Sequence, residues 1–589
     1  EVDVRIAMCF PDVYEIGMSY LGIQILYDMF NRREDTWCER VYSPWPDLHK
    51  IMKEQNIPLF GLESQEPIKN FDFVGLTLQY EMCYTNILQI LDLSQIPLRS
   101  KDRTEKDPLV IGGGPCSYNP EPIADFFDIF YIGEGETRYD DLFDLYKQMK
   151  KDGRSRQEML HEIAKIPGMY VPSLYTVSYK EDGTIDTFAP IYDDVPKTIK
   201  KEIEMDLSTS VYPEKPVVPF IKATQDRIVL EIQRGCIRGC RFCQAGMIYR
   251  PNREKSVARL KELAEQMIAS TGHDEISLSS LSSSDYSELE ELINYLIDEC
   301  GKKKINISLP SLRIDAFSLD IMQKVQDIKK SSLTFAPEAG TQRLRNVINK
   351  GLTVDNIMNG SKQAFEGGWN KVKFYFMLGL PTETEEDMRG IPELANDVAM
   401  LYYDTVPKEN RKGKCQITIS TSFFVPKPFT PFQWARMYPP GEYLRRAKIV
   451  NDHVKEMHNH KSIRYNWHEA DVTVLEGVLA RGDRRLCDTI LYVYEHGGYF
   501  DAWNEYFDYD RWLEAFAATG IDPDFYTMRE RDLDETLPWV FIDVGVTKEF
   551  LKREWKTALG ETVTPNCRMR CSACGAKQFG GGVCYEDKN

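Results

Sequence analysis

Short apolar segments alternate with longer amphipathic segments over residues 227–440, which leaves few folds open to this part of the chain. The predicted strands are residues 228–232, 275–281, 305–309, 332–335, 372–378 and 417–424. The predicted helices between them are residues 253–270, 284–300, 318–328, 341–348 and 383–400. Strands that alternate with helices form parallel sheets, so six such units predict a partial (β/α)6 barrel. Active sites of these barrels lie at the carboxyl ends of the strands.

Three cysteines directly follow the first predicted strand. Cys236, Cys240 and Cys243 have the spacing C-x3-C-x2-C. A four-iron cluster normally takes four protein thiolates, so three would leave one iron free to bind another molecule. Zinc usually has four ligands in two pairs, whereas the next Cys or His residues after this group are His273 and Cys300. A zinc site and three unrelated thiols are the alternatives to an open iron–sulfur cluster.

The cysteine segment resembles the cluster-binding motif of the radical S-adenosylmethionine (SAM) superfamily, including the aromatic Phe242 before the third cysteine. SAM is one of the recognised radical cofactors. The resemblance implies an enzyme in which Cys236, Cys240 and Cys243 bind a [4Fe-4S] cluster that reductively cleaves SAM to a 5′-deoxyadenosyl radical. It also implies an electron donor such as flavodoxin or ferredoxin.

Four later motifs resemble the SAM-binding elements of that superfamily in strand order. Ser279 lies where relatives contact the SAM amino group, although the segment is serine-rich instead of Gly-Gly-Glu. Arg313 resembles arginines that pair with the SAM carboxylate, and a structural ion pair with Asp315 or Glu338 is the alternative. Glu338 begins an E-x-G-[ST]-x-R motif whose glutamate binds the ribose. The adenine side would be formed by Leu378, Gly379 and Pro381, unless these form only a strand-to-helix turn.

Residues 1–190 predict a separate Rossmann-like, doubly wound domain. Its predicted strands (4–10, 73–78, 109–112 and 127–132) alternate with helices such as residues 18–30 and 85–93, which is typical of a parallel sheet. Its glycine turns resemble those of the cobalamin-binding domain fused to many radical SAM proteins. The candidate cobalamin contacts are Thr77, Gly112, Gly113, Gly114 and Glu134.

The histidine of the cobalamin motif D-x-H-x-x-G is missing from residues 11–17. Cobalamin, if bound, would therefore have no protein imidazole on cobalt. A structural Rossmann-like domain without the cofactor is the alternative.

The rest of the chain divides into three further segments. Prolines predict a linker or hairpin over residues 191–226, and residues 441–560 predict a mainly helical C-terminal domain. Residues 561–589 form a Cys-rich tail. An anionic substrate site or a buried salt-bridge network could be formed by Arg481, Asp483, Arg484 and Arg485.

The tail carries Cys567, Cys571, Cys574 and Cys584 in the spacing C-x3-C-x2-C-x9-C. Four thiolates could bind a second [4Fe-4S] cluster or a structural zinc. If Cys584 is not a ligand, one iron would stay open for a substrate or sulfide, and a disordered end is the alternative. Nearly the whole chain resembles a poorly characterised subgroup of fused radical SAM proteins in which this tail also occurs.

Composition limits the setting in which the protein works. The net charge of −18 disfavours broad nucleic-acid binding without excluding a local site. No run of 18 apolar residues is present, so no membrane span is expected. Clustered cysteines in a large chain without a secretory signal predict metal binding in the reducing cytoplasm.

We therefore expect a transferase-type radical SAM enzyme acting on an unknown substrate. The expected reaction is cobalamin-linked methylation, or another modification, of an unactivated carbon. One alternative is methylthiotransferase-like sulfur insertion into RNA or protein with the tail cluster as auxiliary cluster. The other is a non-catalytic iron–sulfur scaffold that senses cobalamin or redox state.

Overall fold

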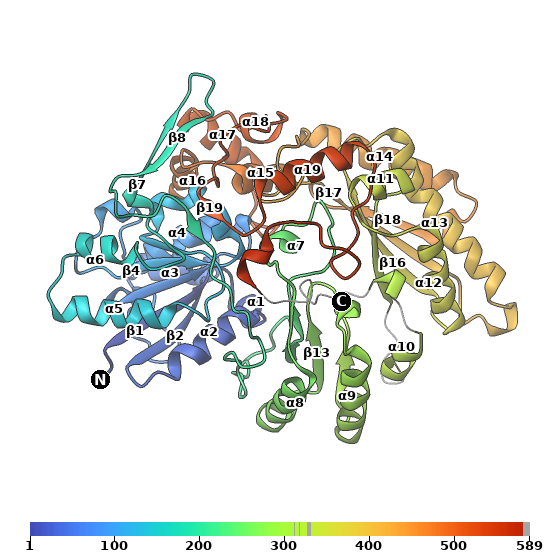
Figure 1. Cartoon of the computed structure of the whole chain (residues 1–589), viewed down its shortest axis with the longest axis horizontal. Helices are drawn as coiled ribbons and strands as arrows, with labels where there is room; N and C mark the ends of the chain where they lie inside the picture. Colours follow the sequence, from blue (N-terminus) through green and yellow to red (C-terminus); the bar gives the residue numbers. More distant parts are fainter. Residues whose placement is uncertain (311–312, 317–318, 327–331, 581–589) are drawn as a thin grey trace. The chain divides into compact units, whose positions relative to one another are not determined.

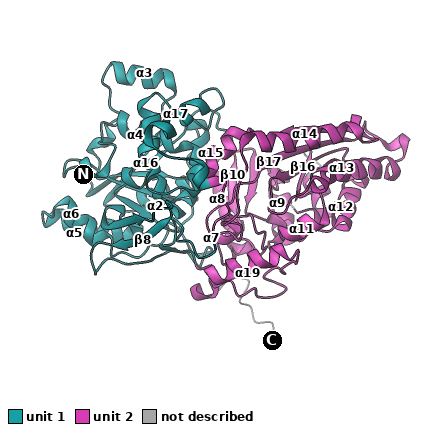
Figure 2. Cartoon of the chain, turned by 90° about the horizontal axis from the view of Figure 1, so that it is seen from above, with its two compact units in different colours: residues 1–226, 478–526, 532–544 teal, residues 227–477, 527–531, 545–589 magenta. Residues whose placement is uncertain are grey.

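The computed structural model describes residues 1–310, 313–316, 319–326 and 332–580, and Figure 1 labels many of its helices and strands. The chain forms two compact units, coloured separately in Figure 2. Unit 1 comprises residues 1–226, 478–526 and 532–544, and unit 2 comprises residues 227–477, 527–531 and 545–589. Both units are of the α/β class, as predicted.

Unit 1 is built on a six-stranded sheet with the order β2-β1-β3-β4-β5-β6. Five strands are parallel and β6 is antiparallel to β5. The strands are β1 (Val4–Phe10), β2 (Thr36–Tyr42), β3 (Phe73–Thr77), β4 (Leu109–Gly113), β5 (Ile129–Tyr131) and β6 (Met169–Tyr170). Their helices are α1 (Tyr14–Gly17), α2 (Leu21–Asn31), α3 (Pro46–Glu54), α4 (Tyr84–Leu93), α5 (Tyr139–Lys151) and α6 (Arg156–Ile163). The predicted doubly wound architecture is confirmed.

Strand β2 was not predicted, because charged residues interrupt its apolar pattern. Its central Glu39 is fully buried, and the carboxylate accepts a hydrogen bond from Ser64 Oγ (2.7 Å) and pairs with Arg5 (3.5 Å). A buried carboxylate needs such partners, and neither of them is visible in the local sequence of the strand.

The segment between residues 478 and 544 contributes helices to unit 1 instead of forming a domain of its own. These are α16 (Leu486–Glu495), α17 (Tyr509–Thr519) and α18 (Asp524–Thr527), and the short strand β19 (Ile542–Asp543) pairs in parallel with β9 (Ile199–Lys200). The hairpin of β7 (Tyr175–Tyr179) and β8 (Ile185–Pro190) precedes the predicted linker. The unit boundaries therefore differ from the predicted separate domain at residues 441–560.

Unit 2 contains seven longer strands that all pair in parallel. They form a three-stranded sheet, β10-β13-β14, and a four-stranded sheet, β15-β16-β17-β18. The strands are β10 (Ile228–Glu231), β13 (Glu275–Ser279), β14 (Asn306–Ser308), β15 (Leu333–Glu338), β16 (Lys371–Leu378), β17 (Gln416–Phe423) and β18 (Ile463–Trp467). The six predicted strands are present in order.

Helices follow these strands, as expected for a partial barrel. They are α8 (Val257–Thr271), α9 (Leu289–Lys303), α10 (Leu319–Gln326), α11 (Gln342–Val347), α12 (Val354–Glu366), α13 (Glu385–Thr405), α14 (Pro440–Glu456), α15 (Ala470–Arg481) and α19 (Lys548–Leu559). The seventh strand, β18, lies within the segment predicted to be helical. It is an edge strand with a polar sequence and mostly exposed or half-exposed residues. None of the helices within the described ranges is long and apolar enough to cross a membrane.

Candidate active site

The three predicted cluster ligands lie on one loop that is closed at its base. Strand β10 leads into β11 (Gln233–Arg234), which pairs antiparallel with β12 (Arg253–Glu254). The loop between them, residues 235–252, carries Cys236, Cys240, Cys243 and the short helix α7 (Ala245–Ile248). Because it follows the first barrel strand, the loop lies at the end of the strand where barrel active sites are found.

Gly235 allows the turn that starts this loop. Its φ is +86°, a region that L-residues rarely adopt. A Cβ atom there would lie 2.6 Å from the carbonyl oxygen of Tyr249 and 3.1 Å from that of Pro251. The two ends of the loop therefore approach each other too closely for any side chain at residue 235.

The thiols of the loop are partly buried and are not in disulfides. Backbone N–H groups donate to two of the sulfurs, from Arg238 to Cys236 Sγ (3.4 Å) and from Gly246 to Cys243 Sγ (3.3 Å). Burial, with smaller contributions from the neighbouring thiols, raises the pKa of Cys236 to about 11 and that of Cys243 to about 12. Hydrogen bonds to sulfur tune iron–sulfur clusters, and metal binding ionises cysteine ligands. The donor set therefore suits a thiolate-bound cluster.

Arg241 fastens the loop to the rest of unit 2. Its fully buried guanidinium donates to Glu554 Oε2 (2.9 Å) and to the carbonyl oxygens of Val347 (3.0 Å) and Thr562 (2.8 Å). Its backbone N–H donates to the carbonyl of Ile348 (2.9 Å). No role was predicted for Arg241, because its partners are distant in sequence.

Arg313, the predicted partner of the SAM carboxylate, lies beside the cysteine loop. It pairs with Asp315 (3.0 Å) and donates to the carbonyl of Lys350 (3.1 Å), so the predicted alternative of a structural ion pair with Asp315 is present. Its positive charge also lowers the pKa of Cys236 against the larger effect of burial. Arg238 in the loop completes the group by pairing with Asp285 (2.6 Å).

Glu338, the predicted ribose ligand, occupies a bulge at the end of β15 and has a φ of +69°. A non-glycine residue in this region is strained, which is common at functional sites. Burial raises the pKa of its carboxyl, and Lys350, 3.8 Å away, opposes that shift. The Lys350 ammonium also lies 6.0 Å from the centre of the Phe242 ring. Lys350 thus links Glu338 to the residue before Cys243.

The other two predicted SAM contacts lie at strand ends. Ser279 is the last residue of β13, and its carbonyl accepts from the N–H of Ile232 (3.1 Å). The segment of Leu378, Gly379 and Pro381 joins β16 to α13, and the N–H of Gly379 donates to Glu383 Oε1 (2.9 Å). The strand-to-helix turn that was the predicted alternative is present. Contacts of these residues with SAM stay a prediction.

The candidate cobalamin contacts lie along the carboxyl edge of the unit 1 sheet. Thr77 and Gly113 are register partners on β3 and β4. The Thr77 hydroxyl is buried and has no hydrogen-bond partner, which is unusual for a buried polar group. Gly112 packs against Phe127, and Gly114 follows the same strand. The carboxylate of Glu134 already has a hydrogen-bond partner within the protein, because its Oε2 accepts from the N–H of Glu204 (2.8 Å).

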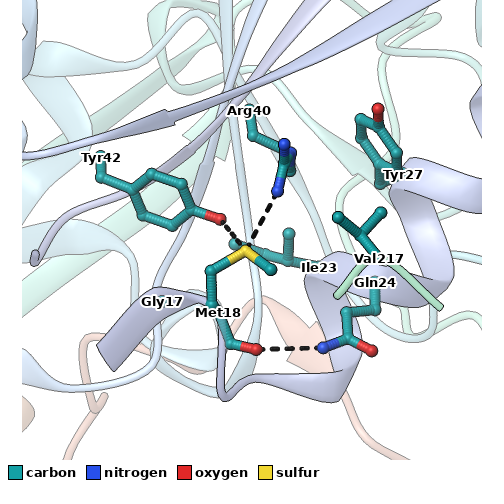
Figure 3. A pocket seen from close by; sticks show the side chains of 8 residues that line it. All are labelled: Gly17, Met18, Ile23, Gln24, Tyr27, Arg40, Tyr42 and Val217. Atoms are coloured by element: carbon teal, nitrogen blue, oxygen red, sulfur yellow. Dashed lines mark hydrogen bonds between the residues drawn. The ribbon is translucent and has the colours of Figure 1, made fainter. Parts of the chain in front are cut away.

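Tyr14 occupies the position of the missing histidine, since Asp12 to Gly17 fit the spacing of D-x-H-x-x-G. Its hydroxyl accepts from the N–H of Phe220 (2.9 Å). The cavity beside Gly17 holds about 10 Å³ and is shown in Figure 3. Arg40 Nη1 (3.2 Å) and the Tyr42 hydroxyl (3.0 Å) point at the Met18 sulfur there. A space of that size suits one water molecule and is far too small for a corrin ring.

The basic cluster after α15 forms a network within unit 1. Arg484 pairs with Glu121 (3.0 Å), and Arg485 pairs with Asp483 (2.7 Å). Asp483 also accepts from the Tyr526 hydroxyl (2.9 Å), and Arg481 Nε donates to the carbonyl of Tyr526 (2.9 Å). Of the two predicted alternatives, the structure shows the buried salt-bridge network.

Three of the four tail cysteines, Cys567, Cys571 and Cys574, are in unit 2, and Cys584 lies outside the described residues. Among the described residues, no three Cys, His, Asp or Glu side chains converge around a single point as ligands of one metal ion do. This applies equally to the tail and to the loop of residues 235–252.

Comparison with known proteins identifies the class. Residues 230–395 match the family described as the radical SAM superfamily, and residues 22–172 match the family described as the N-terminal part of radical SAM proteins. The chain therefore contains a radical SAM domain, as its cysteine loop indicated, and this domain marks the protein as an enzyme.

The individual relatives share no more than 29% sequence identity with this chain in the matched regions. An uncharacterized protein of Methanocaldococcus jannaschii is 29% identical over 529 residues, which cover 88% of this chain and 97% of that protein. A protein of the same organism named "putative methylthiotransferase" is 25% identical over 171 residues, or 27% of this chain and 37% of its own length. Among solved structures, the radical SAM methyltransferase TsrM from Kitasatospora setae, with cobalamin and a [4Fe-4S] cluster bound, has a TM-score of 0.48 at 13% identity. The match covers 74% of this chain and 79% of TsrM.

Proposed function

We propose that the protein binds a [4Fe-4S] cluster through Cys236, Cys240 and Cys243 and uses it to cleave SAM. The observation that carries the proposal is the placing of the three thiols on one closed loop, with Arg313 and Lys350 close enough to shift their pKa values. Such a cluster supplies the electron that splits SAM into methionine and a 5′-deoxyadenosyl radical. The proposed partners are SAM, an unidentified substrate and a reducing protein such as flavodoxin or ferredoxin.

The surrounding side chains suit the parts of SAM. Arg313 provides a guanidinium beside Cys236 that can pair with a carboxylate, and Asp315 holds it in place. Glu338 offers carboxylate oxygens to the two ribose hydroxyls. Lys350 supplies a positive charge that favours the ionised form of Glu338. Binding at these points would hold the sulfonium of SAM near the cluster.

For the second step we propose cobalamin-linked methylation, or another radical modification, of an unactivated carbon. The unpaired hydroxyl of Thr77 beside Gly113 at the sheet edge fits a polar group of a bound cofactor. Tyr14 in place of the histidine means that the motif provides no imidazole to cobalt.

Sulfur insertion is the second candidate, because the tail thiols could support an auxiliary cluster and a short match to a methylthiotransferase-named protein exists. The two reactions differ in what they transfer. With SAM labelled in its methyl group, methylation adds one methyl to the substrate, whereas methylthiolation adds sulfur and a methyl together.

The proposal is tested by measuring 5′-deoxyadenosine after anaerobic reduction of the full-length protein with SAM. We expect the wild type to produce it and Cys240→Ala to produce none. Cys300→Ala removes a thiol that is fully buried in α9 and serves as the matched control, with activity retained. Equal production by Cys240→Ala and the wild type would refute the assignment, and no production by the wild type would favour a non-catalytic scaffold.

A further inference from the structure

The tail beyond α19 lies directly against the cysteine loop. The Thr564 hydroxyl donates to Glu554 Oε1 (2.8 Å), and its N–H donates to Asn349 Oδ1 (2.9 Å). Asn349 in turn donates to the carbonyl of Gly239 (2.9 Å) within the loop. Three residues further on, the N–H of Cys567 donates to the carbonyl of Ile237 (3.0 Å), next to Cys236. Cys567, the first tail cysteine, is therefore hydrogen-bonded to the segment that carries Cys236, the first proposed cluster ligand.

The other two tail thiols lie in a turn that backbone contacts hold in place. The carbonyl of Cys574 accepts from the N–H of Thr547 (2.9 Å), and the carbonyl of Ser572 accepts from Arg553 (2.7 Å). The N–H of Ala573 donates to Cys571 Sγ (3.4 Å). From residue 560 to residue 575 the chain forms no helix or strand and buries no residue fully. Ordering such a segment costs conformational entropy without hydrophobic burial in return, and metal–thiolate bonds are one source of the missing free energy.

The charged side chain of Arg250 lies close to both groups of thiols. It is buried, and its guanidinium donates to the carbonyls of Gly246 (3.0 Å) and Arg238 (3.2 Å) in the cysteine loop. The Arg250 guanidinium therefore lies against the segments that carry Cys236 and Cys243, and it also interacts with the thiols of Cys574 and Cys567. A buried cation placed among thiols stabilises their ionised, metal-binding form.

The tail is also tied to the base of the loop. Arg568, the residue after Cys567, pairs with Glu254 (3.0 Å) on β12, the strand that closes residues 235–252. The spacing of Cys567, Cys571 and Cys574 repeats that of the loop, whereas zinc sites usually group their cysteines in two pairs. The spacing therefore favours iron over zinc.

We propose that Cys567, Cys571 and Cys574 bind a second iron–sulfur cluster beside the SAM-cleaving loop, where the tail is hydrogen-bonded to that loop. The first cluster rests on the proposed function, but the tail site does not depend on which reaction the enzyme performs. The three thiols release their protons when they bind iron, and the fourth iron position takes a ligand from solution.

The test uses the full-length protein reconstituted anaerobically with iron and sulfide. We expect about eight irons and eight sulfides per chain in the wild type, and about four of each in the triple variant Cys567→Ala/Cys571→Ala/Cys574→Ala. The triple variant Cys236→Ala/Cys240→Ala/Cys243→Ala should also hold about four. Cys300→Ala and Cys415→Ala, which remove buried thiols outside both groups, should leave the iron content unchanged.

Electron paramagnetic resonance of the reduced wild type gives a readout that does not require any variant to fold. We expect two cluster signals, of which SAM shifts one. Loss of zinc instead of iron in the tail variant, unchanged iron in that variant, or a single signal in the wild type would each overturn the tail cluster. A tail signal without any effect of SAM on the other would leave the tail site standing and refute the proposed function.

Discussion

The guanidinium of Arg241 and the carboxylate of Glu554 form a buried ion pair with an Nε–Oε2 distance of 2.9 Å. Arg241 stands between Cys240 and Cys243, while Glu554 belongs to α19, more than 300 residues later in the chain. The pair therefore makes the position of the cluster loop depend on the C-terminal part of unit 2. It also anchors a loop that contains little regular structure.

Removing one partner of this pair should loosen the loop. Glu554→Ala leaves the Arg241 charge buried without its carboxylate, which typically costs about 3–5 kcal/mol. We expect a lower free energy of unfolding and a loss of iron from the loop during gel filtration. Glu549→Ala, an exposed position in the same helix, is the matched control. If Glu554→Ala keeps its iron and stability, the pair does not position the loop.

The turn at Gly235 should be intolerant of any side chain. In Gly235→Ala the new Cβ would meet the Tyr249 carbonyl, and the φ of +86° adds strain. Gly272 also has a positive φ (+71°), but no other group lies within 4 Å of the place that a Cβ would take there. Gly272→Ala therefore measures the strain alone, about 1–2 kcal/mol. We expect Gly235→Ala to lose the cluster and Gly272→Ala to keep it. Equal iron content in both variants would show that the close approach at Gly235 is unimportant.

Glu338→Gln tests the ribose contact. A hydrogen bond to a charged group contributes about 1.5–3 kcal/mol, so the KM for SAM should rise roughly 10- to 100-fold. The cluster itself should be retained, because Glu338 is not a thiol ligand. Glu366→Gln at an exposed ion pair of α12 controls for the change of charge and should leave KM unaltered. An unchanged KM in Glu338→Gln would remove Glu338 from the SAM site.

Asp501 gives unit 1 a pH dependence of stability. Its carboxylate accepts from the Thr85 hydroxyl (2.7 Å) and from Trp512 Nε1 (3.2 Å), and burial raises its pKa to about 6. A raised pKa means that the folded state binds the proton more tightly than the unfolded state. The contribution is therefore fully present below about pH 4, the unfolded pKa, and is lost as pH rises through about 6.

Asp501→Asn keeps a neutral side chain of the same shape at every pH. We expect the free energy of unfolding of the wild type in urea, relative to that of Asp501→Asn, to fall between pH 4.5 and pH 7.5 by an amount on the order of 2–3 kcal/mol. Tryptophan fluorescence follows the unfolding. A difference between the two proteins that does not change with pH would contradict the assignment.

The strands of both units could largely be predicted because they are continuous apolar runs. Strand β1 has the predicted limits and β16 begins one residue before them. The elements that escaped prediction depend on distant partners: β2 contains the buried Glu39, and β18 is a polar edge strand that is defined by its pairing with β17. Helix α12 was also missed, although Thr353 and Asn356 form a capping box at its start.

The residues of the candidate site also fall into two groups, those predicted from local motifs and those whose roles depend on long-range contacts. The three loop cysteines are predicted as cluster ligands from their spacing, and Glu338 as a ribose ligand from its motif. Arg241, Arg250 and Lys350 could not be assigned roles, because their contacts join residues that are far apart in the chain or depend on how the loop folds back on itself. Local sequence predicts the ligands of the site, and long-range packing supplies the charges around them.

The central claim is that one iron of the cluster has no protein ligand and binds SAM. Electron–nuclear double resonance of the reduced enzyme tests this claim most directly. SAM labelled with ¹⁵N in its amino group and ¹⁷O in its carboxylate is added to the reduced full-length protein. Binding of SAM to the iron that Cys236, Cys240 and Cys243 leave free predicts hyperfine coupling of both nuclei to the cluster, absent in Cys240→Ala. A reduced cluster that shows no coupling to either nucleus would contradict the account.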